Sequence, residues 1–357
     1  MAETNAYLKG VLDHADRRLR AAVTQLPDGV YLGEDRFEDD CFVPMDIPIK
    51  VAITVQGDAM TVDFTGSHLQ IRGFKNSSVA NTWSGVYTAL SSFLGADIPR
   101  NEGTFRSVEI VAPEGSILNP RPPAPMTMNT IAPACEIINA CWEALGKADP
   151  TRSCAGWGKP GAPVTSGTWP DGRTFVMYHW AAQSGGGAVD GRDGFPQQGG
   201  VNSLCGLVIP NAEAYEQLYP VRVLRQELRT DAAGAGAFRG GPGVDYEVEI
   251  QRPVQIAFRG EAYTSRGAFG VVGGQNGATG TIAFLPEDGG AAVSPNGGYG
   301  IVRVGPGRIR ISSPGGGGWG VPGDRDPALV RQDVLDGIVS PKAAADVYGI
   351  AGLPDPV

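Results

Sequence analysis

The most constraining feature of the sequence is a run of four consecutive glycines, residues 315–318, inside the stretch SSPGGGGWG at 312–320. Glycine has no side chain, so this run cannot perform acid–base chemistry. Its backbone can instead adopt positive φ angles and approach another group closely. Because ordering four glycines costs conformational entropy, we expect the run to serve a close approach. The sequence leaves open whether the neighbour is another segment, a second subunit or an active site.

The composition favours a turn-dense, β-rich fold. Glycine (52 residues) and proline (28) make up more than a fifth of the 357 residues, while hydrophobic residues make up 42%. That apolar fraction is enough for a large core and argues against disorder. The net charge of −9, without a basic stripe, argues against nucleic acids and anionic membranes as partners. No apolar run reaches the roughly 20 residues of a membrane span, and we expect a cytoplasmic protein.

The cysteines are odd in number, widely spaced and without a CxxC pair, which favours reduced thiols over disulfides or a zinc ribbon. They are Cys41, Cys135, Cys141, Cys154 and Cys205. None has a histidine nearby in sequence, so a thiol nucleophile is not favoured.

Periodicity predicts an α+β, strand-rich fold. Predicted helices cover residues 4–26, 79–94 and 134–145, and predicted strands 47–55, 59–64 and 107–111. A loop-rich segment, 153–206, is read as connecting structure or a lid. Short alternating segments from 219 onward predict an antiparallel sandwich or a barrel-like portion. The predicted parts are a mixed α/β portion at 1–214, an antiparallel β portion at 215–325 and a helical tail at 326–357.

Two short helices close the tail, at about 327–336 and 340–347. Asp326 and Ser340 each precede a proline, so each is predicted to cap the N-terminus of its helix.

Several polar residues are candidates for chemistry in the first half of the chain. Asp63 and Arg72 could line a substrate cavity, where a guanidinium can bind an amide or carboxylate oxygen, or they could form a salt bridge that fixes a turn. Glu102 could act as a general base if it were buried, although turn roles are commoner. Asn119 and Arg121 lie in a proline-stiffened loop, where they could contact substrate or brace the loop.

A second candidate is the glycine-rich loop around residues 184–194. Gly186 and Gly187 could let backbone N–H groups face an anion, while Asp190, Arg192 and Asp193 supply charge. The loop matches neither a Walker nor a Rossmann phosphate-binding motif. A solvated, flexible loop is the alternative.

The histidines give weak signals. His14 is expected at the surface, and His179, between two aromatic residues, is expected to be a strand histidine. His68 and Asn76 are candidate substrate-binding residues.

Taken together, several stretches resemble the hydantoinase B/oxoprolinase family. They are 62–67 with 70–73, 98–103, 112–123, 219–222 with 227–229, 236–241, 273–277 and 314–320 with 339–341. The resemblance runs from about Leu12 to Ile350, and the order of the motifs makes it specific.

The resemblance implies a B-type subunit of an ATP-dependent enzyme that opens a cyclic amide: a hydantoin, an oxoproline or a lactam. The implied route is phosphorylation of the carbonyl oxygen by a hydantoinase A-like ATPase partner, followed by hydrolysis. The alternatives are a subunit of an acetone- or acetophenone-type ketone carboxylase and a non-catalytic assembly subunit. Weighed on their own chemistry, the candidate catalytic residues are Asp63, Arg72, Glu102, Asp190, Arg192 and Asp193, and the candidate substrate-binding residues are His68, Asn76, Asn119, Arg121, Gly186 and Gly187.

The chain departs from the family in length and in metal ligands. It looks like only the later portion of such subunits, whose earlier portion carries a His-x-x-Asp and a paired-histidine motif. No such motif occurs here, so we expect no metal ligand from this chain. The resemblance implies that partners supply the rest: ATP and Mg on the ATPase subunit, and a divalent metal (Zn or Mn) on a chain that carries the missing front portion. The isolated chain is expected to be inactive, and the sequence leaves open whether it is a natural split subunit or a fragment.

Overall fold

The structure is a computed structural model that describes residues 2–159, 161–197, 200–201, 208–209, 211–261, 263, 266–295 and 298–354. The chain forms two compact units. The first comprises Met1–Asp40 and Asp46–Ser153, and the second comprises Cys41–Met45 and Cys154–Val357. Within the described residues, no helix is both long and apolar enough to cross a membrane.

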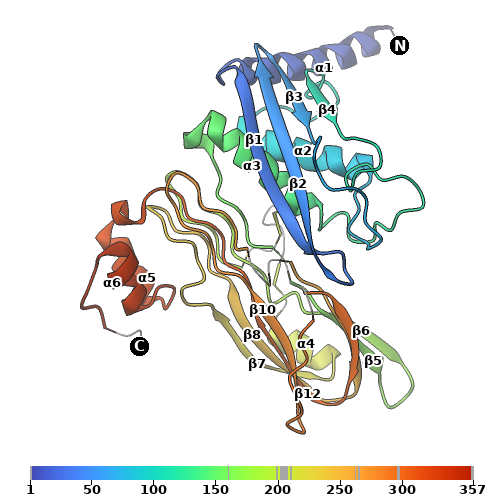
Figure 1. Ribbon diagram of the computed structural model, residues 1–357, viewed down its shortest axis with the longest axis vertical. Helices are drawn as coiled ribbons and strands as arrows, with labels where there is room; N and C mark the ends of the chain where they lie inside the picture. Colours follow the sequence, from blue (N-terminus) through green and yellow to red (C-terminus); the bar gives the residue numbers. More distant parts are fainter. Residues whose placement is uncertain are drawn as a thin grey trace. The chain divides into compact units, whose positions relative to one another are not determined.

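The first unit is a four-stranded sheet with three helices (Figure 1). Its strands, in spatial order, are β1 (Gly29–Asp39), β2 (Pro44–Gln56), β3 (Ala59–Asp63) and β4 (Val108–Val111). β2 and β3 are antiparallel, whereas β3 and β4 are parallel. The helices are α1 (Ala2–Val23), α2 (Val79–Leu94) and α3 (Ala134–Ala148), followed by a short 3₁₀ turn at Pro150–Arg152.

Two features hold this unit together: the alternate burial of side chains along β2, and the close packing of β1 against α3. Every second residue of β2 from Ile47 to Val55 is buried, as expected for a strand with one face on the core. Helix α3 packs against β1 and α2. A Cβ at Gly33 would lie 2.0 Å from the Ala140 carbonyl oxygen, so β1 and α3 can approach this closely only because residue 33 is glycine.

The second unit contains two four-stranded antiparallel sheets around one apolar core. One sheet has the order β10 (Thr281–Pro286), β12 (Gly307–Ser312), β8 (Val244–Ile250) and β7 (Val221–Leu228). The other has the order β11 (Gly300–Val304), β9 (Val254–Phe258), β5 (Val164–Thr168) and β6 (Thr174–Tyr178). Inward residues of both sheets share the core, among them Met177, Tyr246, Ile256 and Ile309. The predicted antiparallel sandwich is confirmed, as two open sheets.

The four-glycine run forms the centre of a bundle of extended segments in this unit. The N–H groups of Gly315 and Gly318 donate to the carbonyls of Ala278 and Gln275 (3.1 and 2.9 Å), three residues apart on one neighbour. Gly316 and Gly317 donate to two other segments, at Gly241 and Gly156, both at 2.9 Å. Partners that recur every third residue, with no bond inside the segment, are typical of a polyproline II helix, which has three residues per turn. We call this arrangement the glycine bundle.

Sterics explain the glycines. A Cβ at positions 315 to 318 would lie 1.8, 2.0, 1.9 and 2.2 Å from backbone oxygens of Ala232, Gly186, Phe269 and Ala235. Positive φ plays no part in the run, because within 314–320 it occurs at Gly320 alone. The expected close approach is confirmed, and the neighbours are segments of the same unit.

Among its described residues, the second unit also contains the helices α4 (Ala212–Leu218), α5 (Pro327–Leu335) and α6 (Pro341–Tyr348), with a 3₁₀ turn at Pro322–Asp324. The predicted caps are confirmed: Asp326 accepts a hydrogen bond from the Ala328 N–H, and Ser340 accepts one from the Ala343 N–H.

The structure contains elements that were not predicted from the sequence, α4 among them. Strand β1 was not predicted, because its acidic residues are poor strand formers. The segment 153–206, predicted as loop-rich, contains β5 and β6. Since β5 pairs with β9, the boundary between the compact units falls after Ser153, whereas the predicted mixed portion extends to 214.

Candidate functional site

Ionisable side chains are buried where β1 ends in the first unit. The inward face of β1 carries Asp35, Phe37 and Asp39, at alternate positions. Lys75 donates from Nζ to Asp39 Oδ1 at 2.8 Å and to the Asp39 carbonyl at 3.1 Å. Both side chains are at most 1% exposed, and the ammonium lies 5.1 Å from the centroid of the Phe37 ring. Lys75 and Asp39 therefore form an ion pair that is removed from bulk water.

The next residue, Asp40, holds an arginine at the edge of this region. Its Oδ2 accepts a hydrogen bond from Arg72 Nε at 2.8 Å. The Asp40 side chain is 4% exposed and that of Arg72 is 63% exposed. The buried Asp40 carboxylate therefore holds the positively charged Arg72 guanidinium at the solvent-exposed edge of this region.

Asn76 fixes the loop that carries Arg72 and Lys75. Its Oδ1 accepts from the Ile71 N–H at 2.9 Å, and its Nδ2 donates to the carbonyls of Ile71 (2.8 Å), Gly73 (2.9 Å) and Pro125 (3.0 Å). A fully buried amide with its bonds satisfied is rigid. The structure thus places Asn76 as the brace of this loop.

Helix α3 faces the same strand with further polar groups. Asn139 Nδ2 donates to Asp35 Oδ2 at 3.1 Å. Glu136, fully buried, precedes Asn139 by three residues and so lies on the same helix face. We call the six side chains of this region the charged cluster: Asp35, Asp39, Asp40, Arg72, Lys75 and Glu136.

The charged cluster is the candidate functional site. Five of its members are buried, and burying charge is strongly unfavourable unless it is paired. Clusters of this kind are typical of functional sites, although structural networks also form them. Sequence analysis identified Arg72 but missed Asp35, Asp39, Asp40, Lys75 and Glu136. The available signal was the acidic run EDRFEDD at 34–40, whose alternate residues share a strand face.

The other predicted residues of the first unit lie at the end of β3, in loops and in a turn. Asp63 accepts from the Thr65 N–H at 2.8 Å, and Asn119 donates to the Ala112 carbonyl at 2.9 Å. Arg121 lies 3.3 Å from Glu114 in an exposed ion pair. His68 Nδ1 is 2.7 Å from the Leu69 carbonyl oxygen, and Glu102 is exposed in a turn. Their predicted roles in chemistry stay predictions.

The glycine-rich loop of the second unit is tied into the structure. Gly186 and Gly187 belong to the glycine bundle, where a Cβ at Gly187 would lie 1.9 Å from the Ala155 carbonyl oxygen. Asp190 is exposed, and the Arg192 guanidinium lies 4.8 Å from the centroid of the Phe195 ring.

Asp193 joins a buried network with two arginines. Its carboxylate accepts from Arg325 Nη1 (2.8 Å) and Nη2 (2.7 Å), and from the Arg239 N–H (2.9 Å). Asp333 accepts from Arg325 Nη2 at 2.7 Å and from Arg239 Nε at 2.8 Å. Burial disfavours the charged Arg325, but hydrogen bonds and charges of Asp193 and Asp333 outweigh this and raise its pKa. These contacts connect the loop to α5.

His179 is a neutral core residue. It is fully buried, with Nε2 3.2 Å from the Thr165 hydroxyl and Nδ1 3.3 Å from the Tyr246 hydroxyl. Burial lowers its pKa to about 3, so it is uncharged near pH 7. Burial also raises the pKa of the Cys141 thiol to about 12, which leaves no thiolate there. Cys205 lies outside the described residues.

Among the residues that the structure describes, no three histidine, cysteine, aspartate or glutamate side chains are grouped so that they could hold a metal ion. The charged cluster does contain carboxylates, and its hydrogen bonds join them to the cations Lys75 and Arg72 and to the Asn139 amide. We therefore derive no step from a metal on this chain.

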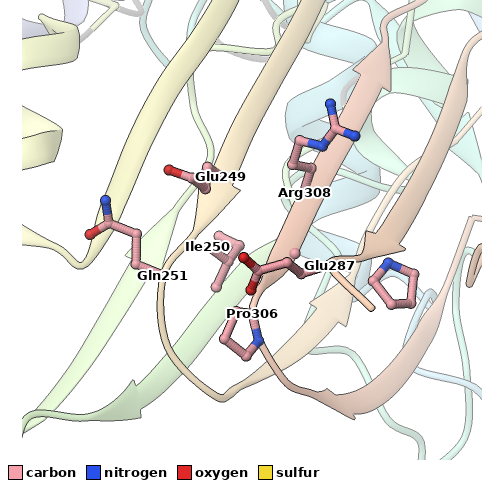
Figure 2. A pocket seen from close by; sticks show the side chains of 8 residues that line it. Glu249, Ile250, Gln251, Glu287, Pro306 and Arg308 are labelled. Atoms are coloured by element: carbon pink, nitrogen blue, oxygen red, sulfur yellow. The ribbon is translucent and has the colours of Figure 1, made fainter. Parts of the chain in front are cut away.

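A separate pocket of about 320 Å³ lies where β8 and β10 end and β12 begins in the second unit. Figure 2 shows Glu249, Glu287 and Arg308 around it. Arg308 donates from Nη1 to Glu247 Oε1 at 2.8 Å. None of the residues predicted from the sequence as site residues lines this pocket.

Comparison with known proteins decides the family. The family model Hydantoinase B/oxoprolinase matches residues 1–322. The chain belongs to the hydantoinase B/oxoprolinase family. The beta chain of caprolactamase from Pseudomonas jessenii is 32% identical over 98% of this chain and 61% of its own length. The B-type chain of a putative D-/L-hydantoinase from a Pseudomonas species is 28% identical over 95% of this chain and 58% of its own length.

Solved structures agree on the fold. The ATP-dependent caprolactamase of Pseudomonas jessenii superposes with a TM-score of 0.85 at 29% identity, covering 99% of this chain and 62% of that chain. A nucleotide-free acetone carboxylase superposes with a TM-score of 0.77 at 19% identity, covering 95% of this chain and 51% of that chain, and shows a shared fold alone. This chain spans about three fifths of the length of the caprolactamase and hydantoinase relatives. The resemblance inferred from the sequence motifs is confirmed.

Proposed function

We propose that this chain is a B-type subunit of an ATP-dependent enzyme that opens a cyclic amide, and that its charged cluster forms part of the reaction chamber. The observation that carries the proposal is the pairing of Arg72 with the buried Asp40 beside the buried Lys75–Asp39 pair. An arginine held by a buried carboxylate keeps a fixed direction, and a guanidinium suits carboxylate, amide and phosphate oxygens. The ATP-dependent caprolactamase relative supports this substrate class.

The chemistry needs activation by phosphate. A ring amide is a poor electrophile, and transfer of the γ-phosphoryl group of ATP to the amide oxygen makes its carbon reactive. Water then adds to this carbon, the ring C–N bond breaks, and a second water hydrolyses the resulting acyl phosphate to carboxylate and phosphate. In this scheme the residues of the chain bind and orient: Arg72 lies near the developing negative charge on oxygen, and the Asp39–Lys75 pair fixes the loop that carries it.

Other polypeptides would supply the phosphoryl donor and any metal. The sequence contains no GxxxxGK[ST] motif, which is the usual phosphate-binding loop of P-loop enzymes. We therefore assign ATP and Mg to a hydantoinase A-like partner. We assign a divalent metal such as Zn or Mn to the portion of the relatives that this chain does not span.

Reconstitution tests this proposal. The chain is co-expressed with an ATPase subunit and with a polypeptide that carries the remaining family length, and ATP consumption is followed over hydantoin, 5-oxoproline, caprolactam and, with bicarbonate, small ketones. We expect ADP release that depends on a cyclic amide and is matched by ring-opened product. Turnover only with a ketone and bicarbonate would replace the proposal with a carboxylase. A complex without turnover on any of these substrates would favour the assembly role.

A further inference from the structure

A pocket of about 380 Å³ lies in the second unit between α6 and two threads of the glycine bundle. The threads, residues 231–235 and 275–278, form one wall. Residues of α6, Ala343 and Tyr348 among them, form the other. None of the residues predicted from the sequence as site residues lines it.

The two threads bond to each other and to the glycine run. Ala278 donates to the Ala232 carbonyl at 2.8 Å, and Gln275 donates to the Ala235 carbonyl at 2.7 Å. Toward the centre of the bundle, Gly234 donates to Gly316 at 2.8 Å, and Gly318 donates to Gln275 at 2.9 Å. These hydrogen bonds hold the two threads against each other and against the glycine run.

One residue of each thread stays outside this pattern. Ala233 and Asn276 both line the pocket. Within the described residues, neither backbone N–H donates a hydrogen bond to another backbone group, and neither carbonyl accepts one. Everywhere else along these threads, at least one backbone group bonds to a neighbouring segment. In the part of the chain that the structure describes, Ala233 and Asn276 thus lack a backbone partner where they line the pocket.

We infer that this pocket binds a glycine-, alanine- and proline-rich segment of a partner polypeptide in the polyproline II conformation, as an additional thread of the glycine bundle. Such a helix has three residues per turn and solvated backbone groups, so it can offer a carbonyl and an N–H to Ala233 and Asn276. At Ala233 its residue facing the threads must be glycine or alanine, so that the two backbones can come within hydrogen-bond distance, while Asp231, Gln275 and Asn276 line the same wall with polar side chains. Tyr348 gives the apolar surface on which proline packs in known recognition of this conformation.

The inference goes beyond the proposed function, and its test needs no catalysis. The probe is the peptide acetyl-Gly-Ala-Pro-Gly-Ala-Pro-amide, titrated to millimolar concentration into the isotope-labelled full chain. We expect saturable amide shifts at Ala233 and Asn276, moving toward the positions of hydrogen-bonded amides. The same peptide with valine in place of both glycines is the control, and it should leave both signals in place.

Two variants fill the pocket from opposite walls: Gln275→Trp, at an exposed side chain, and Ala343→Trp on α6. Ala345→Trp, on the same helix but outside the pocket lining, is the matched control. We expect the affinity to fall about tenfold or more in the first two, about 1.4 kcal/mol, and to stay unchanged in the third. A thermal melt shows which variants are folded. Because the Gln275 side chain is exposed, Gln275→Trp alone decides the test if Ala343→Trp does not fold. Absence of saturable shifts, equal binding of the valine peptide, or binding unaffected by Gln275→Trp would overturn the inference.

Discussion

At the scale of single residues, Lys75 and Asp39 show that the buried charges of the cluster need compensating partners. Each is almost fully withdrawn from water, and each compensates the other at 2.8 Å. Removing one member of such a buried pair leaves the charge of the other poorly compensated.

Lys75→Met is therefore expected to lower the free energy of unfolding by about 3–5 kcal/mol. Urea unfolding followed by circular dichroism measures this. Lys50→Met is the matched control in the same unit, because Lys50 is half exposed and 4.0 Å from Glu34. That exposed contact should be worth less than about 1 kcal/mol. Equal effects of the two substitutions would show that the Lys75–Asp39 pair contributes no special stability.

His179 makes stability depend on pH. Its folded-state pKa of about 3 lies below its ordinary value of 6.5, so the unfolded chain binds the proton more tightly. The contribution of His179 to stability is therefore present above pH 6.5 and is lost as the pH falls toward 3. Over that window, the free energy of unfolding of the wild type should fall with decreasing pH more steeply than that of His179→Gln, by about 1.4 kcal/mol per pH unit. Parallel curves would mean that His179 is protonated in the folded protein.

Sequence reasoning at this scale depended on motifs. Arg72 and Asn76 were identified because they lie in or beside a stretch that resembles the family. Asp39 and Lys75 were missed because their pairing joins residues 36 positions apart, and no local pattern reports such a contact. Asp190 and Asp193 looked equivalent in sequence, whereas the structure exposes one and pairs the other.

At the scale of elements, the glycine bundle depends on backbone contact rather than on side chains. Gly316→Ala would place a Cβ 2.0 Å from the Gly186 carbonyl oxygen. We expect it to destabilise the chain by at least about 3 kcal/mol or to prevent folding. Gly323→Ala is the control, because nothing lies within 4 Å of its Cβ position, and it should change stability by less than about 0.5 kcal/mol. Thermal melts compare the two, and a folded Gly316→Ala of native stability would contradict the packing described.

The loop at 190–194 and α5 depend on each other through Asp193. Asp193→Ala removes the acceptor of two Arg325 hydrogen bonds and should cost about 2 kcal/mol. Asp190→Ala, in the same loop but exposed, should be neutral. If Asp193 serves only in catalysis, the two variants will unfold at the same urea concentration.

Elements with strong periodicity were predicted well. Residues 79–94 form α2 as expected, and the alternating segments after 219 form β7 to β12. The unpredicted strand β1 carries Asp35 and Asp39, and Asp40 directly follows it. Its burial alternates, but charged residues lie on both of its faces, so the sequence shows no alternation of apolar and polar residues. The glycine run predicted a close approach, but the identity of its neighbours depends on segments up to about 160 residues away.

At the scale of the whole molecule, the chain spans about three fifths of the length of its caprolactamase and hydantoinase relatives. We expect the purified chain alone neither to hydrolyse ATP nor to open hydantoin or caprolactam. Phosphate release and ring-opening assays check this. ATP hydrolysis by the isolated chain, retained after further purification, would contradict the assignment of ATP to a partner.

The most direct test of the account measures kcat/KM for ring opening in the reconstituted complex with Arg72→Gln and Arg173→Gln. Both arginines are exposed, but Arg72 is held by the buried Asp40 and Arg173 by the exposed Asp171. We predict a loss of about 100-fold or more for Arg72→Gln, about 2.7 kcal/mol of transition-state stabilisation, with the complex still assembled and Arg173→Gln unaffected. Equal activity of the two assembled variants would contradict the assignment of the charged cluster to the reaction chamber.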